Sequence, residues 1–477
     1  MAERRLPILG VMAIAVGAIG FAARKAPEPT AAEFAAVPAP VTPHVRGGDR
    51  LSTTYYCAGS PATGEGVSGS VTVVNPGDVQ IEGTYTVFVP AGPPVAQPIS
   101  VGPRSRVSLA LTGVADVPYV GATVEFAGNG GVVEQQVTTG AGTSLSPCST
   151  DASTSWYFAD GVTLDGDDYD LVLSNPFAEA AIVDMTFVTA SGRRTPNNFQ
   201  SFVVPPQSVR AVDVDGVAKL ESQLSVALVS RSGRFVAARA QTFAGSGRSG
   251  YSMTLGAPGL GREWNFADGE VGEGIAESVA VFNGTPDPVE VDVVVVPGDV
   301  NDAPLDPVTV TVDGMSTQIV DVSGLEGIRD KIVSGRHALL VRTLSTDSVV
   351  AERVITKQVD DKSVTGVTFG SQLVSPVWWL PTGVPSAVEN GLVVFNTTGL
   401  TGTVTVSQIG PGGAVAIPGL SDLPIGGGAI LHLDLTAAEA ANAALLVTSS
   451  GPDLVVEQRP PRQTGPGRSA ALAVPQQ

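Results

Sequence analysis

Apolar and polar residues alternate in short runs along this chain. In one run, Val183, Met185 and Phe187 alternate with polar residues. Matching runs with the same parity lie at residues 84–87, 289–293 and 404–407. Alternation with a period of two predicts β-strands that have one buried and one solvent-exposed face. Turn-forming residues such as Asn-Pro-Gly at 75–77 separate the runs, so the pattern predicts an all-β chain.

A longer pattern occurs four times. Trp-Tyr-Phe-Ala-Asp-Gly at 156–161 returns as Trp-Asn-Phe-Ala-Asp-Gly at 264–269 and, more diverged, as Trp-Trp-Leu-Pro-Thr-Gly at 378–383. A first copy begins with Tyr-Cys-Ala-Gly at Tyr56. An apolar run that ends in Asn follows each opening, and these residues are Asn75, Asn175, Asn283 and Asn396. Because the pattern recurs at intervals of roughly 110 residues, the repeated units are whole domains.

Each unit ends on a third match, which carries an arginine in three of the four copies. These residues are Arg239, Arg353 and Arg459. Their constant relation to the opening tryptophans, Trp156, Trp264 and Trp378, favours an internal role, in which each guanidinium stacks on or hydrogen-bonds near the indole. Recognition of an anionic ligand is the alternative.

Units of about 100 residues with seven or so short strands predict four tandem immunoglobulin-like antiparallel β-sandwiches. We place the domains at residues 51–150, 151–258, 259–372 and 373–463, with a disordered tail at 464–477. A propeller blade is about half as long as one of these units, so a propeller is the weaker reading.

Composition narrows the class of partner. Gly and Pro number 56 and 36, which suits a chain with many turns. Asp and Glu number 46 against 27 Lys and Arg, and the net charge of −19 repels phosphate backbones. Nucleic acid is therefore excluded as the expected partner.

The N-terminal segment suggests export. Residues 6–23 contain no charged side chain, and Arg4 and Arg5 precede them. The run is longer than most signal-peptide cores and slightly shorter than a typical spanning helix. We expect a single-pass anchor with residues 1–25 as tail and anchor, a Pro-rich stalk over 26–50, and the bulk of the chain extracytoplasmic. A cleaved signal peptide and secretion are the alternative.

The chain has two cysteines, Cys57 and Cys148, which fall near the two ends of the first repeat. We expect them to form a disulfide, which suits an oxidising compartment. Two unrelated buried thiols are the alternative.

The combined motifs resemble an uncharacterised actinobacterial domain of unknown function. Its repeats read roughly Trp-Tyr-Phe-Ala-Glu-Gly, then Asn-Pro, then Val-Ala-Glu-Arg, and the resemblance spans residues 51 to about 463. The resemblance implies an exported and often anchored protein with no assigned activity. It supplies no catalytic residue.

The tryptophans could serve as platforms for sugar rings. Their recurrence at one position favours packing within the core or at domain junctions for Trp156, Trp264 and Trp378. Trp379 occurs only in the fourth repeat, so we expect it to be the exposed ring and the candidate glycan contact.

The densest acidic cluster could hold Ca²⁺, although a solvated acidic turn is the simpler reading. Its carboxylates are Asp165, Asp167, Asp168 and Asp170. The chain has three histidines and lacks a phosphate-binding loop and a Gly-x-Ser-x-Gly motif, so we expect no cofactor and no resident metal.

These observations favour a non-catalytic envelope protein with a scaffold, adhesion or protein-interaction role. A carbohydrate-binding protein of the cell wall is the alternative, and a glycan-active enzyme with two carboxylates in a shared cleft is the third class.

Overall fold

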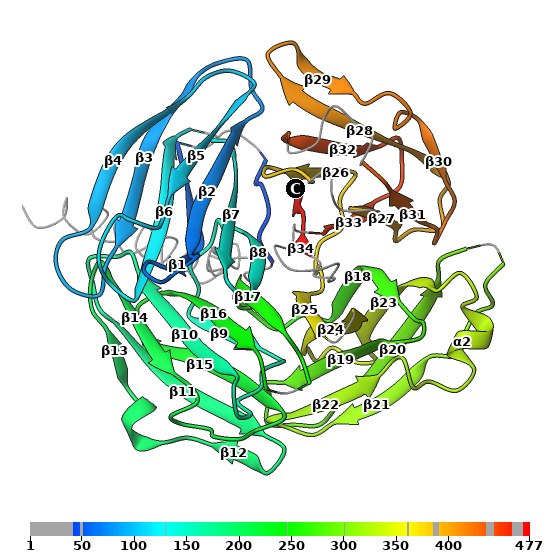
Figure 1. Cartoon of the computed structure of the whole chain (residues 1–477), viewed down its shortest axis with the longest axis horizontal. Coiled ribbons are helices and arrows are strands. Elements are labelled where there is room, and N and C mark those ends of the chain that lie inside the picture. The colour runs from blue at the N-terminus through cyan, green and yellow to red at the C-terminus, as the bar shows by residue number, and fades with distance from the viewer. Residues whose placement is uncertain are drawn as a thin grey trace, which may run out of the picture. The chain divides into compact units, whose positions relative to one another are not determined.

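The computed structural model describes residues 42–47, 51–128, 130–245, 247–299, 301–359, 362–384, 391–435, 443–459 and 471–477. Strands dominate these residues, and each of the four repeats builds its own pair of antiparallel sheets (Figure 1). The prediction of an all-β chain is therefore confirmed.

The first two repeats contain seventeen strands. Those of the first repeat are β1 (Ser52–Pro61), β2 (Ser68–Asn75), β3 (Ile81–Phe88), β4 (Val95–Val101), β5 (Ser105–Ala110), β6 (Tyr119–Ala127), β7 (Val132–Thr139) and β8 (Gly142–Pro147). Those of the second are β9 (Ser155–Phe158), β10 (Asp168–Asn175), β11 (Ala181–Thr189), β12 (Gly192–Arg194), β13 (Phe202–Val204), β14 (Ser208–Asp213), β15 (Leu224–Ser232), β16 (Val236–Phe243) and β17 (Gly250–Leu255), with a 3₁₀ turn η1 (Asn197–Phe199).

The last two repeats follow the same plan. The third contains β18 (Glu263–Glu270), β19 (Ile275–Asn283), β20 (Val289–Pro297), β21 (Val308–Val312), β22 (Ser316–Asp321), the short helix α2 (Ile328–Lys331), β23 (Arg336–Thr343), β24 (Val350–Val359) and β25 (Lys362–Phe369). The fourth contains β26 (Val377–Leu380), β27 (Leu392–Asn396), β28 (Gly402–Gly410), β29 (Gly413–Ala416), β30 (Leu423–Ile425), β31 (Ile430–Leu433), β32 (Leu445–Ser449), β33 (Leu454–Gln458), β34 (Ala471–Leu472) and β35 (Val474–Pro475).

The strand order differs from that of an immunoglobulin domain. In the first repeat the two sheets have the orders β1-β6-β3-β4 and β5-β2-β7-β8, and the other repeats follow the same scheme. In an immunoglobulin domain the last strand lies beside the F strand. Here the first strand of each repeat takes that place, in the pairs β1–β6, β9–β15, β18–β23 and β26–β32, so the immunoglobulin-like connectivity is not confirmed.

The opening tryptophans fill the cores between the two sheets. Trp156, Trp264 and Trp378 are all fully buried. The indole N–H groups of these three residues donate, in the same order, to Phe235 O, Val349 O and Leu454 O at 2.9 to 3.0 Å. The three acceptors occupy equivalent positions near the start of the closing strand of each repeat. A buried indole needs such an acceptor. These three rings are therefore packing elements.

The recurring Asn holds the turn after the second strand of every repeat. Asn283 is fully buried, and its Nδ2 donates to Asp287 O at 2.7 Å and to Val312 O at 3.0 Å. Its Oδ1 accepts the Thr285 N–H at 2.9 Å. The same bonds to the residues two and four positions ahead are made by Asn75, Asn175 and Asn396. One side chain thus satisfies the main chain of a whole turn.

The predicted disulfide is present. Cys57 on β1 and Cys148, which follows β8, are bonded and lie 91 residues apart in the sequence. The bond joins the two ends of the first repeat. A loop of that length stabilises a domain by about 4 kcal/mol when chain entropy alone is counted.

The two ends of the described chain pair with each other. Val45 N–H donates to Pro475 O, and Gln477 N–H donates to Val45 O, at 2.8 and 2.9 Å. Strands β34 and β35 extend the two sheets of the fourth repeat. The prediction of a disordered tail is therefore wrong for residues 471–477, and a free stalk is wrong for residues 42–47. Main-chain hydrogen bonds between the two segments hold them in place, which their composition did not indicate.

The predicted single-pass membrane protein is not supported. In the described ranges no helix has the length and apolar character needed to cross a bilayer. The apolar segment at residues 6–23 and the rest of the predicted tail and anchor lie outside the described residues.

Replacing Asn283 by Ala should lower the free energy of unfolding by about 3 kcal/mol, because the buried Val312 carbonyl and the partly buried Asp287 carbonyl lose their donor. Urea denaturation followed by circular dichroism measures the change. Asn301→Ala is the control, since Asn301 is exposed. Equal stability of the two variants would contradict a structural role for the Asn283 side chain.

Candidate functional site

Buried glutamates connect successive repeats. Glu352 on β24 is fully buried, and its Oε2 accepts the N–H groups of Ala159 and Asp160 from the second repeat at 2.9 and 2.6 Å. Arg239 of the second repeat donates to both carboxylate oxygens, at 3.1 and 2.9 Å. The main-chain N–H groups of Ala159 and Asp160 in the opening motif thus bind a carboxylate of the next repeat.

The junction between the third and fourth repeats uses the same parts. Glu457 accepts the Ala267 N–H at 2.8 Å and an Nη2 hydrogen of Arg353 at 2.6 Å. A second buried pair lies beside it, in which Arg459 donates to both oxygens of Asp268 at 2.9 and 2.7 Å. Burial alone would raise the pKa of Asp268, but the Arg459 guanidinium and its hydrogen bonds bring that pKa down to about 2.

The fourth repeat is joined to the first by Glu134. Its Oε2 accepts the Thr382 N–H at 3.0 Å, and its Oε1 accepts a hydrogen from Gln458. Pro381 stands where the other motifs have Ala and provides no N–H, so Thr382 is the donor. This glutamate has an amide partner instead of a guanidinium. Burial consequently raises its pKa to about 7, while its hydrogen bonds lower it.

The junction between the first and second repeats lacks this carboxylate. Ala238 occupies the position of Glu352, and the Gly59 N–H is satisfied within its own repeat by Gln135 at 2.7 Å. Strands β8 and β17 contact each other here, and Ser144 Oγ accepts the Met253 N–H at 2.9 Å. Three junctions are thus held by a buried acid and one by apolar packing and side-chain hydroxyls.

The strand register corrects two sequence assignments. The cross-strand pairs Val71–Gln135, Leu171–Arg239, Val279–Arg353 and Leu392–Gln458 are equivalent in the four repeats. Arg459 therefore lies one position after the residue that corresponds to Arg239. Likewise Tyr55, which pairs with Val124, takes the place of Trp156, and Tyr56 lies on the opposite face of the strand.

The repeated arginines contact the phenylalanine of the opening motif. The Arg239 guanidinium carbon lies 5.7 Å from the ring centre of Phe158, and that of Arg353 lies 5.4 Å from the ring centre of Phe266. We expected the tryptophan as the partner. The phenylalanine lies two residues after the tryptophan on the same face of the strand, and its ring is the one that the arginine contacts.

Sequence reasoning missed the three acids Glu134, Glu352 and Glu457. A signal was available, because each directly follows at least two apolar residues at the start of its strand, as in Val350-Ala351-Glu352. A charge in such a strand is buried and needs a partner. The partner belongs to another repeat, and repeat alignment alone does not identify it.

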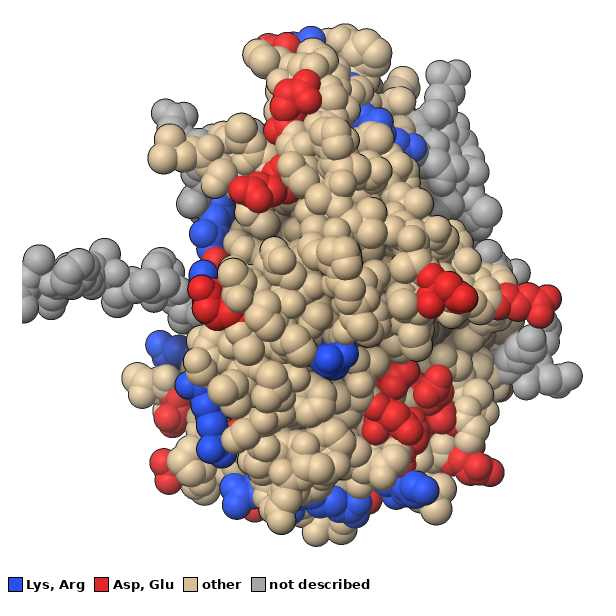
Figure 2. All heavy atoms as spheres, turned by 90° about the vertical axis from the view of Figure 1, so that its left-hand side faces the viewer, with Lys and Arg blue, Asp and Glu red and all other residues tan. Residues whose placement is uncertain are grey.

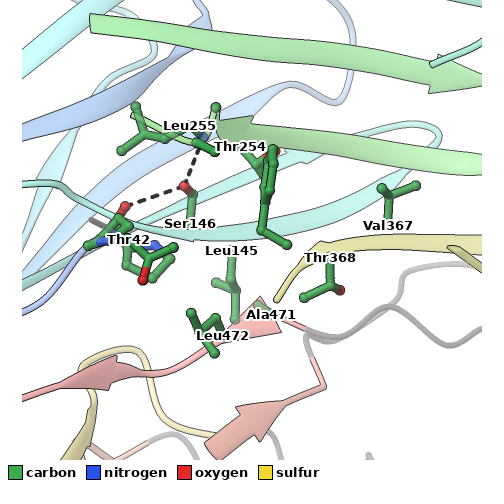
Figure 3. A pocket seen from close by; sticks show the side chains of 14 residues that line it. Thr42, Leu145, Ser146, Thr254, Leu255, Val367, Thr368, Ala471 and Leu472 are labelled. Carbon is green, nitrogen blue, oxygen red and sulfur yellow. Dashed lines mark hydrogen bonds between the residues drawn. The ribbon is translucent and has the colours of Figure 1, made fainter. Parts of the chain in front are cut away.

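The last strands of the four repeats meet at a small apolar cavity. Strands β8, β17, β25 and β34 contact one another in a closed sequence. The cavity has a volume of about 50 Å³ and is lined by Leu145, Leu255, Val367, Leu472 and residues 42–43, among others (Figure 3). This is far below the roughly 300 Å³ of a typical ligand pocket. We therefore treat it as a packing void.

The acidic cluster separates into two groups. Asp167 Oδ1 accepts the N–H groups of Ala244 and Gly245, both at 2.8 Å. Asp170 faces Asp213 across β10 and β14, and burial followed by neighbouring carboxylates raises its pKa to about 6. In the part of the chain that the structure describes, no group of three or more acidic, His or Cys side chains is arranged to hold a metal ion. These carboxylates are therefore not proposed as a calcium site.

The histidines lie in partly or fully buried places. His337 is fully buried with its Nε2 at 2.9 Å from Glu277 Oε2. Burial lowers the pKa of His432 to about 4, so this ring is neutral at pH 7. His432 is half-buried, and Asp268, Arg336 and His337 of the third repeat lie near it.

Comparison with known proteins gives limited information. Residues 131–252 match a family of unknown function, DUF5719, and this match starts directly before β7 and ends in β17. None of the curated proteins matches the chain. The crystal structure of Thermotoga maritima 1070 is 18% identical with a TM-score of 0.20, and the similarity covers 23% of this chain and 93% of that one.

Glu134 should make stability fall as the pH rises. Its pKa is about 7 in the folded chain against an ordinary value of 4.5, so its contribution is complete below pH 4.5 and is lost as the pH rises through 7. The full effect is about 3 kcal/mol. Urea unfolding of wild type and Glu134→Gln at pH 5 and pH 8 tests this, and the variant should show a smaller pH difference. An identical pH dependence would be contrary to the prediction.

Glu352→Ala should destabilise the chain by about 3–5 kcal/mol, because it removes the carboxylate from the buried Arg239 guanidinium and leaves two buried N–H groups without an acceptor. Glu352→Gln keeps an acceptor and should cost less. Thermal unfolding of the two variants measures the difference. A variant Glu352→Ala as stable as Glu352→Gln would show that the junction does not depend on this acid.

Proposed function

We propose that this chain is a non-catalytic binding scaffold, in which four β-sandwich repeats are fixed to one another and present their outer sheets to a partner. The observation that supports this most directly is the use of the recurring residues. The Trp and Asn positions build each repeat, and the Arg and Glu positions join one repeat to the next. The recurring polar side chains thus stabilise the repeats and the junctions between them.

A fixed frame suits a binding role. Buried, hydrogen-bonded carboxylates tolerate little displacement, because separation of the repeats would leave charges unpaired in a dry environment. A surface spread over several repeats is then preorganised, and a partner loses less free energy to ordering on binding. The same rigidity would also suit spacing between two bound molecules.

The outer sheets, which are those that end in β4, β12, β21 and β29, offer the contact surface. Strands β4, β12, β21 and β29 end the sheets in which they lie, and most of their residues are exposed or half-buried. A sheet edge can accept an extended segment of another protein. Figure 2 shows one face on which acidic and basic side chains form small separate groups among broad uncharged areas. Such a surface favours a protein or neutral partner over a polyanion.

Carbohydrate binding is the second candidate, but not through an exposed ring. Trp379 is only 7% exposed, so the expected exposed platform is wrong at this position. The ring instead contacts Val132 and Val474. Burial follows from β35, which pairs directly with Trp379 and covers it.

The scaffold proposal is tested by affinity capture with the full chain on a support. Proteins eluted from wild type are identified, purified and titrated back by calorimetry. We expect at least one saturable partner, and we expect Glu352→Ala to weaken its binding about tenfold or more because the frame loosens. Asp330→Ala, at an exposed position of the short helix α2, is the matched control and should bind as wild type. Equal binding by Glu352→Ala would contradict the need for a rigid frame, and failure to recover any saturable partner would contradict the proposal.

A further inference from the structure

One sheet edge lacks the features that protect the other outer edges from pairing. Strand β21 (Val308–Val312) ends its sheet at the outer side of the third repeat (Figure 1). Its sequence, Val-Thr-Val-Thr-Val, contains neither a charged residue nor Pro. Among the other outer edge strands, β4 contains Pro98, β12, β13 and β30 have three residues each, and β29 has four. Proline and short length discourage pairing with another strand, so β21 is the outer edge most open to it.

The main chain of β21 points away from its sheet at Thr309 and Thr311. Glu290 O on β20 accepts the N–H of Leu344, which follows β23, so the main chain of Glu290 points toward β23. Glu290 is opposite Thr311 in the register of β20 and β21, and Asp292 is opposite Thr309. In an antiparallel pair, opposite residues either exchange hydrogen bonds or both point away from each other. The N–H and C=O groups of the two threonines therefore point to the free side of β21.

This free side has no main-chain partner within the described ranges of the chain. The main-chain hydrogen bonds of residues 308–312 there are those of the ladder with β20. The side chains of Thr309 and Thr311 are exposed, and those of Val308 and Val310 are half-buried. Two N–H and two C=O groups are thus in position to form the bonds by which a sheet accepts a further strand.

The two faces of the sheet beside this edge differ in chemistry. Val308 and Val310 pack against the hydrophobic core of the third repeat. Thr309 and Thr311 lie on the other face, together with the acids of β20, because side chains alternate along a strand and opposite residues share a face. A strand added here would meet apolar side chains on one face and polar side chains on the other. Its own residues should therefore alternate between apolar and polar.

Acidic side chains without a paired cation surround the edge. Glu290 lies beside it on β20, and Asp306 and Asp313 lie just beyond its two ends. All three are exposed, and no ion pair among the described residues involves them. Asp292, by contrast, is paired with Arg342 at 3.4 Å. Positive charges on an added strand would be attracted here, whereas a second copy of this chain would bring like charges together.

We propose that the free edge of β21 binds an extended basic segment of another protein, in which apolar residues on one face alternate with Lys or Arg on the other. Thr309 and Thr311 supply the main-chain hydrogen bonds, and Glu290, Asp306 and Asp313 attract the positive charges. The inference rests on the proposed scaffold role, and it names the edge that the partner uses and the chemistry of the partner.

Fluorescence anisotropy of labelled peptides with the full chain tests the proposal. The probe is Lys-Val-Lys-Val-Lys-Val-Lys. One control peptide has Glu in place of Lys, and the other has the same residues in the order Val-Val-Val-Lys-Lys-Lys-Lys. We expect saturable binding of the probe that weakens as salt is added, and binding at least about tenfold weaker for both controls.

Two variants separate main-chain pairing from general attraction to an acidic surface. Thr311→Pro removes an N–H that faces solvent, which an edge strand tolerates, and should weaken binding of the probe about tenfold. Thr311→Val keeps that N–H and is the matched control, which should bind as wild type. Glu290→Lys leaves the main chain intact and should also weaken binding, so the proposal can be tested even if Thr311→Pro folds poorly.

The proposal is overturned if the probe does not saturate, if the reordered peptide binds as tightly, or if folded Thr311→Pro binds as wild type. Capture of a saturable protein partner that Thr311→Pro leaves unchanged would also overturn it, while the scaffold role would stand. Saturable binding of the probe without any protein partner in the capture experiment would support the edge and contradict the scaffold role alone.

Discussion

The arrangement of the repeats depends on one interaction, the acceptance of main-chain N–H groups of one repeat by a buried glutamate of the next. At the junction of the second and third repeats, Glu352 receives two N–H groups and a guanidinium. A carboxylate that leaves water loses several kcal/mol of solvation, which only a complete set of donors offsets. The interaction therefore specifies one relative position of the two repeats and makes other positions costly.

The junctions are not equivalent, and the differences have physical reasons. Glu352 and Glu457 face arginines, whereas Glu134 faces the amide of Gln458. Burial raises the pKa of all three carboxyls; a nearby arginine opposes this rise at Glu352 and Glu457, whereas only hydrogen bonds from Thr382 and Gln458 oppose it at Glu134. The junction of the first two repeats has Ala238 at the position of the glutamate, and Tyr119 of the first repeat donates to Asp170 of the second at 2.8 Å. There the disulfide stabilises the first repeat, and hydroxyl groups on β8 join it to β17.

The contact of the fourth repeat with the first brings together residues that are distant in the sequence. The chain ends pair near residues 45 and 476, and Trp379, Tyr55 and Gln476 meet at one cavity. The axial void between β8, β17, β25 and β34 is small and apolar, and it reflects the meeting of four similar strands. The cavity at the last junction is larger because that junction is built from the most diverged repeat and the two chain ends.

The sequence by itself determined the repeat, the strands and the single disulfide. Period-two alternation and turn residues report local conformation, and the recurring Trp and Asn report packing inside one unit, so both can be read from neighbouring residues. It did not determine which residue faces which. A slip of one position, as between Tyr55 and Tyr56 or between Gln458 and Arg459, moves a side chain to the other face of its strand. Only the tertiary structure decided the partners of Glu134, Glu352 and Glu457, the burial of Trp379 and the pairing of the chain ends, because each of these contacts joins segments that are far apart in the sequence.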